Sequence, residues 1–311
     1  MECGNYLPRR RLGKTELNIP VIPFGTQGFG NNFGAVSDEN AVALVKHAVG
    51  LGVNHFDCAR CYGDSLRKLG LALREIRRDE VIITGRLCCH SASEWGDYGE
   101  GEPDYSLERV IGDVENQLVE LGIDYFDGML IHDPKDIDRA LAKNGTLEGL
   151  LQLKSRGLVP NVGFGKRPHD FHLKAIETGN VDFLLCFSDY NLIRKTAASK
   201  LIPAAHAADV GVMNGWSILR GLLTGVDIDE ARESGLYRDE EDVEASREIW
   251  KWCQREKIEL LQLALQFCIR EDRIHGNPIG SLNKIQLEAN ILAASRPVEE
   301  AVWKKFDLKF G

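Results

Sequence analysis

The feature that most constrains this fold is an alternation of short apolar runs with longer segments of helical period, which begins at residue 21 and continues almost to the end of the chain. Such alternation is typical of parallel strands covered by helices. The apolar runs occupy residues 21–25, 53–57, 81–84, 126–132, 159–165, 181–187, 210–216 and 275–280. Eight such runs match a closed barrel better than an open sheet, which more often has about five or six strands. We therefore predict an α/β fold, a (β/α)8 TIM barrel formed as a single domain by residues 1–311, with residues 1–20 forming a hairpin that closes the bottom of the barrel.

The segments between the apolar runs predict helices and loops. Helical periodicity indicates helices at residues 38–51, 65–76, 107–121, 146–156, 169–178, 197–209, 244–255, 258–268 and 283–294. Left-handed glycines are expected to end four of them, at positions 52, 122, 157 and 211. Residues 88–106 and 219–242 fit neither a strand nor a helix. Because both segments follow strands, on the face where barrels carry their sites, we expect them to be substrate loops.

Composition limits the classes of binding partner and the cellular location that we expect. The formal net charge is -9 and acidic residues are spread along the chain, which argues against nucleic acid or an anionic membrane as the main partner. No stretch approaches the roughly 18 uninterrupted apolar residues of a spanning helix, and the first residues lack the apolar core of a secretory signal. We therefore expect a cytoplasmic protein that acts on a small molecule. Its eight cysteines are expected to be mostly reduced, without disulfides, and the oligomeric state is left open.

One segment carries a motif between an apolar strand and a helix: Phe56-Asp57-Cys58-Ala59-Arg60-Cys61-Tyr62-Gly63. It resembles the signature of the aldo-keto reductase superfamily, in which an Asp at the strand end and a later Tyr face the same pocket. The resemblance extends over nearly the whole chain, including residues 10–26, the Ile131-His132 strand end and residues 280–290. The stretch at residues 24–36 particularly resembles the branch of L-galactose and L-fucose (D-threo-aldose) dehydrogenases.

The resemblance implies roles for three residues. Tyr62 would be the general acid or base, Asp57 would hold a cation, and His132 would orient the reacting carbonyl or alcohol. A phenol, with a pKa of about 10, gives up a proton at neutral pH only if a nearby positive charge stabilises the phenolate. The family uses a Lys for this purpose.

That Lys is missing from the expected position. The strand reads Ile83-Thr84-Gly85-Arg86, and we place Gly85 where the Lys would stand. Side chains alternate across a strand, so Arg86 is expected to point to the opposite face unless the backbone bends. Arg86 is nevertheless our candidate for the fourth catalytic residue, with Arg60 and Lys166 as other sources of charge.

Three functions remain open from the sequence. The first is a nicotinamide-dependent oxidoreductase that acts on a sugar or a related polyol or carbonyl by hydride transfer, with Arg86 or another cation in place of the Lys. The second is a sugar lyase, epimerase or dehydratase on the same barrel. The third is a non-catalytic protein that only binds the nicotinamide cofactor.

The resemblance also implies a set of cofactor-binding residues. These are Gly25, Thr26, Trp216, Ser217, Gly221, Gly280, Ser281, Lys284, Gln286 and Asn290. Trp216 resembles the aromatic platform for the nicotinamide, although a Trp that merely closes the barrel would look the same. NAD is favoured over NADP, because Gly280 and Gln286 stand at positions where members that prefer NADP often carry basic residues. Lys284 is the residue that would reverse this preference.

Three weaker signals complete the sequence-based expectations. Trp95 and Tyr98, in the loop at residues 88–106, are candidate substrate-binding residues suited to a sugar. Cys58, Cys61, Cys88 and Cys89 have the types and spacing of a four-thiolate zinc site. We expect no metal site, because the catalytic signature already explains the presence of this segment. His55 is expected to be a core histidine.

Overall fold

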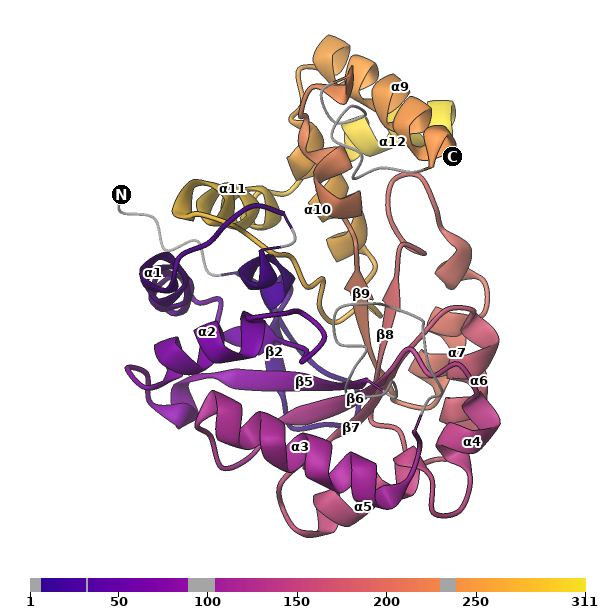
Figure 1. The fold of residues 1–311 in the computed structure, drawn as a ribbon. Coiled ribbons are helices and arrows are strands. Elements are labelled where there is room, and N and C mark those ends of the chain that lie inside the picture. Colours follow the sequence, from indigo (N-terminus) through magenta and orange to yellow (C-terminus); the bar gives the residue numbers. More distant parts are fainter. Residues whose placement is uncertain (1–6, 32, 89–103, 230–238) are drawn as a thin grey trace.

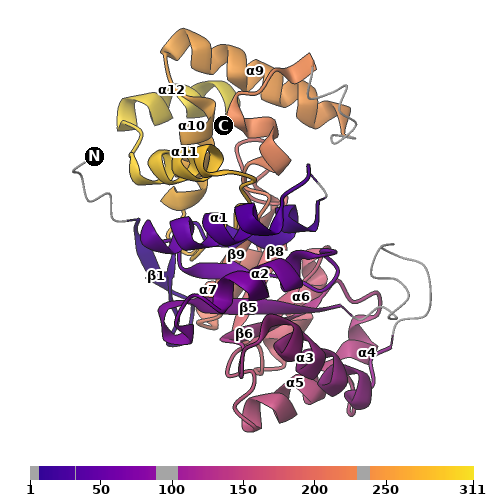
Figure 2. The ribbon, with the colours of Figure 1, turned by 60° about the vertical axis from the view of Figure 1, so that its left-hand side comes forward.

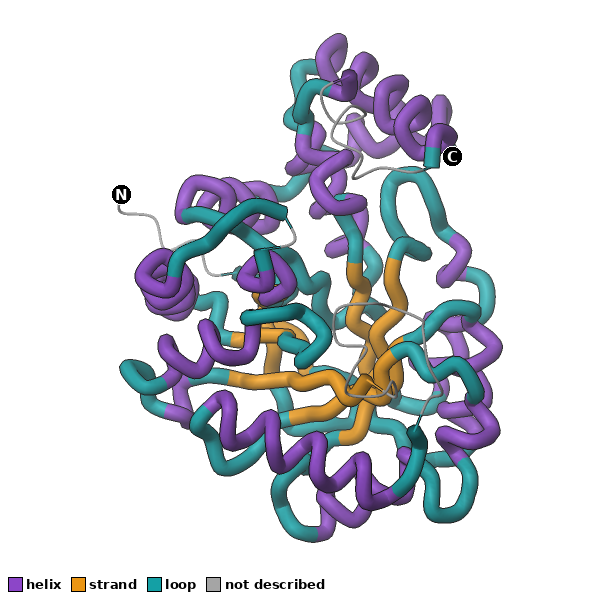
Figure 3. Tube along the Cα trace, in the orientation of Figure 1, coloured by secondary structure: helices purple, strands orange, loops and turns teal. Residues whose placement is uncertain are grey.

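The structure is a computed structural model, and it describes residues 7–31, 33–88, 104–229 and 239–311. Its centre is one parallel sheet of seven strands, each hydrogen-bonded to the next in chain order. The strands are β3 (Phe24–Gly25), β4 (His55–Asp57), β5 (Ile82–Cys88), β6 (Gly128–His132), β7 (Val162–Gly165), β8 (Phe183–Phe187) and β9 (Gly211–Gly215). Figure 3 shows these strands in the middle of the molecule with helices around them.

The eighth apolar run closes the sheet without forming a regular strand. Single parallel bridges join Met213 to Gly276 and Phe24 to Ile279, so this run lies between β9 and β3. Backbone hydrogen bonds hold it on both sides, with Asn214 N 2.8 Å from Gly276 O and the amide of residue 25 bonded to Ile279 O at 3.0 Å. Neither Pro278 in this run nor Pro23 in the facing segment has an N–H to donate, so each removes one possible ladder hydrogen bond. The predicted (β/α)8 barrel is therefore confirmed.

The helices lie mostly where their period predicted them. Their bounds are α1 (Asp38–Gly50), α2 (Ser65–Leu73), α3 (Leu107–Leu121), α4 (Ile137–Leu141), α5 (Thr146–Ser155), α6 (His169–Glu177), α7 (Leu201–Ala207), α9 (Glu240–Glu256), α10 (Leu260–Arg270), α11 (Lys284–Ser295) and α12 (Glu300–Phe310). The helices α4 and α12 were not predicted, and a 3-10 helix at Leu219–Thr224 occupies part of a segment expected to be loop. The expected left-handed glycine at position 211 was wrong: Gly211 begins β9, and Asp209 has the positive φ of 48° instead.

Helix α3 shows why several boundaries could be read from the sequence. Ser106 Oγ accepts a hydrogen bond from the backbone N–H of Arg109 and caps the helix N-terminus. At the other end Gly122 adopts φ 69°, the left-handed conformation that terminates a helix at little cost. The predicted and observed bounds of this helix are the same.

The helices form two groups. Helices α1, α2, α3, α5, α6, α7 and α11 contribute side chains to the apolar cluster around the sheet. Helices α9 and α12 contribute to a second cluster that includes Trp252, Trp303 and Phe306, and α10 contributes to both. Figures 1 and 2 both show α9 and α12 at one end of the molecule, away from α3 and α5. No described helix is long and apolar enough to cross a membrane.

An antiparallel hairpin of β1 (Arg9–Arg11) and β2 (Asn18–Pro20) precedes the barrel. Its turn lies against the start of β9, where Lys14 N donates to Asp209 O at 2.6 Å. Leu12 is fully buried, in a cluster with Leu130, Phe183 and Met213. These last three side chains belong to sheet strands, so Leu12 fills the barrel interior from its lower end.

Candidate active site

The site is centred on a buried ion pair between neighbouring strands. Asp57 ends β4 and Arg86 lies in β5, and Arg86 Nη2 donates to Asp57 Oδ2. The second carboxylate oxygen accepts a hydrogen bond of 3.1 Å from Thr84 Oγ1. Only 1% of the Asp57 side chain is exposed, so a buried carboxylate is compensated by a guanidinium and a hydroxyl. Thr84 was not among the site residues predicted from the sequence.

The expected orientation of Arg86 was wrong. Thr84 and Arg86 both reach Asp57, so they share the inner face of β5, and the residue between them points outward. A Cβ added to Gly85 would lie 2.6 Å from Met129 Cε and 2.7 Å from Phe126 Cε1, among the side chains beneath the outer helices. No bend is needed, because position 85 never faced the site. The inward residue is Arg86.

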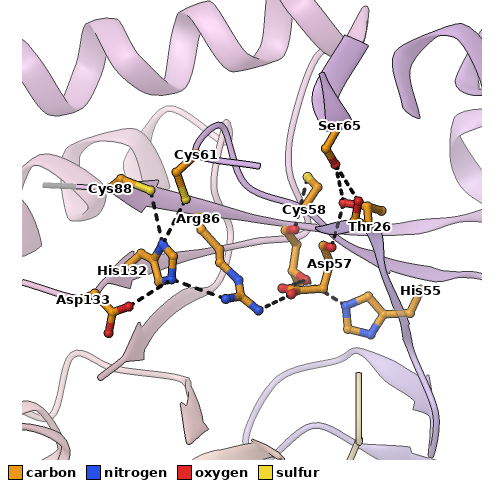
Figure 4. A network of polar contacts seen from close by, with 11 residues as sticks. Thr26, His55, Asp57, Cys58, Cys61, Ser65, Arg86, Cys88, His132 and Asp133 are labelled. Atoms are coloured by element: carbon orange, nitrogen blue, oxygen red, sulfur yellow. Dashed lines mark hydrogen bonds and ion pairs between the residues drawn. The ribbon is translucent and has the colours of Figure 1, made fainter. Parts of the chain in front are cut away.

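His132 joins this cluster from the end of β6. Its Nε2 lies 3.4 Å from Arg86 Nη1 and 3.4 Å from Asp133 Oδ2. Its Nδ1 lies 3.2 Å from Cys88 Sγ and 3.7 Å from Cys61 Sγ. Figure 4 shows the imidazole between these two sets of groups, with the thiols on one side and the charged groups on the other.

Tyr62 packs beside both the cation and the imidazole. Its ring centroid is 5.4 Å from Arg86 Cζ and 6.4 Å from the His132 ring, which meets it edge-on. The side chain is buried, and this desolvation raises the pKa of the phenol well above its usual value, while Arg86 acts in the opposite direction. The phenol is therefore protonated at neutral pH. Burial makes its proton harder to release, and Arg86 partly offsets that effect.

The other cations considered from the sequence lie elsewhere. Arg60 Nη1 donates to Asp113 Oδ1 at 2.6 Å, and Lys166 lies 6.0 Å from the ring of Phe171. The cation that contacts the Tyr62 ring is Arg86.

His55 is buried behind the ion pair. Its Nε2 is 2.9 Å from Thr84 Oγ1, and burial lowers the pKa of the imidazole to about 4. His55 is therefore neutral at physiological pH. It donates its proton to the threonine that in turn donates to Asp57.

The predicted nicotinamide-side residues follow β9. Trp216 has a positive φ of 59°, and its ring lies 5.5 Å from that of Phe187 and 4.0 Å from Arg220 Cζ. Ser217 is fully buried, and its Oγ has no hydrogen-bond partner among the described residues. Gly221 adopts φ 103°, a conformation that favours glycine. Ser217 is thus a polar group that the fold leaves unsatisfied, as expected in a site completed by a ligand.

The predicted adenosine-side residues follow the run that closes the barrel. A Cβ on Gly280 would lie 3.1 Å from Gly25 O, so the two glycines bring the chain segments close together. Asn290 Nδ2 donates to Ser281 Oγ at 3.1 Å. Lys284 is exposed at the N-terminus of α11, the end of a helix that attracts phosphate groups.

Two predicted binding residues have their polar groups engaged within the protein. Gln286 Oε1 accepts a hydrogen bond of 2.7 Å from the backbone N–H of Leu282. Thr26 is fully buried, and its hydroxyl donates to Asp57 O at 3.1 Å and accepts from Ser65 at 2.7 Å. Thr26 therefore ties β3 to the end of β4. The two aromatic residues predicted to contact substrate, at positions 95 and 98, lie outside the described residues.

Comparison with known proteins gives a consistent result. The profile of the Aldo/keto reductase family matches residues 21–309. L-galactose dehydrogenase of Arabidopsis thaliana is 29% identical over 295 residues, covering 92% of this chain and 88% of the relative. D-threo-aldose 1-dehydrogenase of a Pseudomonas species is 24% identical over 311 residues, covering 92% and 93%. The holo form of an aldo-keto reductase from Bacillus halodurans shares the fold, with a TM-score of 0.79 at 20% identity, over 98% of this chain and 97% of that one.

Proposed function

The chain belongs to the aldo/keto reductase family and is an oxidoreductase, and from this premise we propose that it oxidises a hydroxyl group of a sugar, or reduces the matching carbonyl, with NAD as its preferred cofactor. The single observation that carries this proposal is the cluster of Tyr62, Arg86, Asp57 and His132 at the ends of neighbouring strands. A phenol, a fixed cation and an imidazole are the groups needed to move a proton to or from a carbonyl oxygen.

Each residue of the cluster has a distinct task in this proposal. Tyr62 donates its phenolic proton to the carbonyl oxygen in the reduction, and takes a proton back in the oxidation. Arg86 stays protonated, so it stabilises the phenolate as a fixed charge and relays no proton itself. Asp57 holds Arg86 in place, and His132 orients the reacting oxygen through Nε2. Because Arg86 supplies the charge usually supplied by a Lys, no role is needed for position 85.

The residues present fit a nicotinamide dinucleotide. When bound, this cofactor supplies or accepts the hydride. Trp216 and Ser217 would hold its nicotinamide half, and residues 280–290 would hold its adenosine half. The unsatisfied hydroxyl of Ser217 and the N-terminus of α11 support this assignment. The uncharged side chain of Gln286 favours NAD over NADP, because a 2'-phosphate is normally bound by a paired cation.

The relatives support the substrate class. Two of them are named as dehydrogenases of L-galactose and of D-threo-aldoses, and a third as an L-glyceraldehyde 3-phosphate reductase. Their substrates are aldoses or short sugar phosphates. We assign the same chemistry, a polyhydroxylated carbonyl compound or its cyclic form, to this chain.

The test is a spectrophotometric assay of NADH and NADPH formation with a panel of aldoses, deoxysugars and polyols. Turnover should be fastest with an aldose and NAD, and simple aliphatic alcohols should react far more slowly. Tight binding of NAD without turnover on any member of the panel, in either direction, would overturn the proposal in favour of a non-catalytic nicotinamide-binding protein. A faster reaction with NADP would overturn only the cofactor preference.

A further inference from the structure

Two thiols and an imidazole converge beside the proposed proton-transfer groups. Cys61 Sγ, Cys88 Sγ and the facing nitrogen of His132 all lie within 4.8 Å of one another. Cys88 ends β5, His132 ends β6, and Cys61 comes from the segment after β4, so three successive strands contribute one group each. In the part of the chain that the structure describes, no other cluster of three such ligands is found. The proposed proton transfer uses neither thiol.

The spacing of these atoms fits a tetrahedral metal ion. Zinc binds thiolate sulfur at about 2.3 Å and imidazole nitrogen at about 2.0–2.1 Å, which places sulfur and nitrogen about 3.5 Å apart. The two sulfur atoms lie 3.2 Å and 3.7 Å from His132 Nδ1, on either side of that separation. A set of two cysteines and one histidine is an established zinc ligand set with one position left open.

The second nitrogen of the imidazole has the partner that a metal-bound histidine normally has. Asp133 Oδ2 lies 3.4 Å from His132 Nε2, on the side of the ring away from the thiols. Arg86 Nη1 lies at the same distance of 3.4 Å from Nε2 and can only donate, so a proton on Nε2 would be directed at Asp133 and would displace the contact with Arg86. That tautomer leaves the Nδ1 lone pair directed at the sulfur atoms, and the carboxylate makes the ring a better ligand. The two thiols and the imidazole thus supply three metal ligands, and the carboxylate supports the imidazole from behind.

The nearby Cys58 does not belong to this cluster, although its spacing from Cys61 suggested a metal-binding pair. Its thiol is fully buried and donates to Thr84 O at 3.4 Å. The fourth cysteine considered from the sequence, at position 89, lies outside the described residues. The ligand set is therefore different from the one that the sequence suggested.

We propose that Cys61, Cys88 and His132 bind one zinc ion, with a fourth coordination position open to water or a small ligand. This revises the expectation of no metal site. The two thiols release their protons to solvent on binding. With Nδ1 bound to the ion, the imidazole keeps its one proton on Nε2, directed at Asp133 in place of the contact with Arg86. The site shares His132 with the proposed dehydrogenase. The two proposals are nevertheless tested separately, because metal binding can be measured without sugar or dinucleotide.

The test uses the full chain, reduced and stripped of metal. Zinc affinity is measured by competition with a chromophoric chelator, and cobalt(II) is added separately to detect the charge-transfer absorption of cobalt–thiolate bonds. One zinc ion should bind per chain, and cobalt should produce the thiolate band. C61S and C88S should each weaken zinc binding by more than about 10-fold, since loss of even an outer ligand costs about 10- to 100-fold. D133N, which loses only the outer carboxylate, should weaken it by about 10-fold.

The matched control is C58S, which removes a cysteine from the same motif and retains a hydroxyl that can donate to Thr84 O. Its zinc affinity and cobalt spectrum should equal those of the unmodified chain. Equal losses in C58S, C61S and C88S, or a spectrum without the thiolate band, would overturn the proposal. If the serine variants fail to fold, alkylation of the unmodified chain replaces them: zinc should protect Cys61, and unchanged alkylation of Cys61 would count against the site.

Discussion

The two sides of the barrel mouth are built in different ways. At the ends of β4, β5 and β6, Asp57, Arg86 and His132 are already connected to one another through their side chains. At the ends of β9 and the run that closes the barrel, the corresponding groups are a helix N-terminus, an exposed lysine and the unsatisfied hydroxyl of Ser217. In the proposed mechanism, the first side holds its charged groups in place before substrate binds, and the second side is completed by the dinucleotide. In the proposed enzyme, the protein alone fixes the proton-transfer groups, whereas the cofactor-binding groups gain their partners only when the dinucleotide is bound.

The largest effect is expected from Tyr62→Phe on the preassembled side. Removal of the hydroxyl removes the proton donor, so kcat/KM for NAD-linked turnover should fall by about 10²- to 10⁴-fold. The ring remains, so the dissociation constant for NAD, measured by fluorescence titration, should change little. Activity within threefold of the unmodified enzyme would contradict the role of Tyr62.

The second effect concerns the buried ion pair. Arg86→Met leaves the Asp57 carboxylate buried without its cation, which should lower the free energy of unfolding by about 3–5 kcal/mol in urea denaturation. Arg86→Lys keeps the charge and should retain more of both stability and activity. The matched control is Arg67→Met, because Arg67 pairs with Asp38 on the surface and its loss should have little effect. Similar losses of unfolding free energy in Arg86→Met and Arg67→Met would contradict a buried Arg86–Asp57 ion pair that is already formed without substrate.

A smaller effect concerns His55, behind the same pair. Its pKa is about 4 in the folded chain, against about 6.5 in the unfolded chain, so only the unfolded chain gains a proton between these pH values. The free energy of unfolding should therefore fall as the pH falls from 6.5 to 4, by at most about 1.4 kcal/mol per pH unit from this residue.

His55→Gln should flatten that pH profile. His172 has a similarly lowered pKa of about 4, for the same reason of burial, and lies outside the cluster. His172→Gln should flatten the profile too while sparing turnover. A pH profile of unfolding that neither substitution alters would contradict the neutral state of both imidazoles.

The smallest effect is expected on the ligand-completed side. Gln286→Arg places a guanidinium where the proposed adenosine half binds, so the ratio of kcat/KM for NADP to that for NAD should rise by about 10-fold. Lys284→Gln provides the comparison, because it removes the exposed cation already present on α11 and should lower the same ratio. If both ratios stay unchanged, residues 284–286 do not contact the adenosine ribose.

The barrel was predictable because its signals are local. Each apolar run and helical segment carries its own period, and caps such as Ser106 and Gly122 mark the ends of α3 directly. Helix α12 was missed because it buries only Trp303 and Phe306 among many charged residues, which leaves a narrow apolar stripe.

The site was only partly predictable, for a different reason. Asp57 and Tyr62 lie in one short motif, whereas the orientation of Arg86 depends on which face of β5 meets Asp57. Side chains do alternate across β5, but the prediction assumed that Gly85 faced the site. Thr84 is the residue paired with Asp57, so Thr84 and Arg86 lie on the inner face. The contact between Cys61, Cys88 and His132 likewise depends on the register between strands, which no local pattern contains.

The run at residues 275–280 affects how the barrel stays closed. It is joined to its neighbours by single bridges at Gly276 and Ile279 and by backbone hydrogen bonds that residues 275, 277 and 279 donate. The chain continues from there directly into residues 280–290. In the proposed function, a dinucleotide bound by residues 280–290 would therefore also hold together the segments that close the barrel. Cofactor binding would then also stabilise the closed barrel, and the free energy of unfolding should rise with dinucleotide concentration.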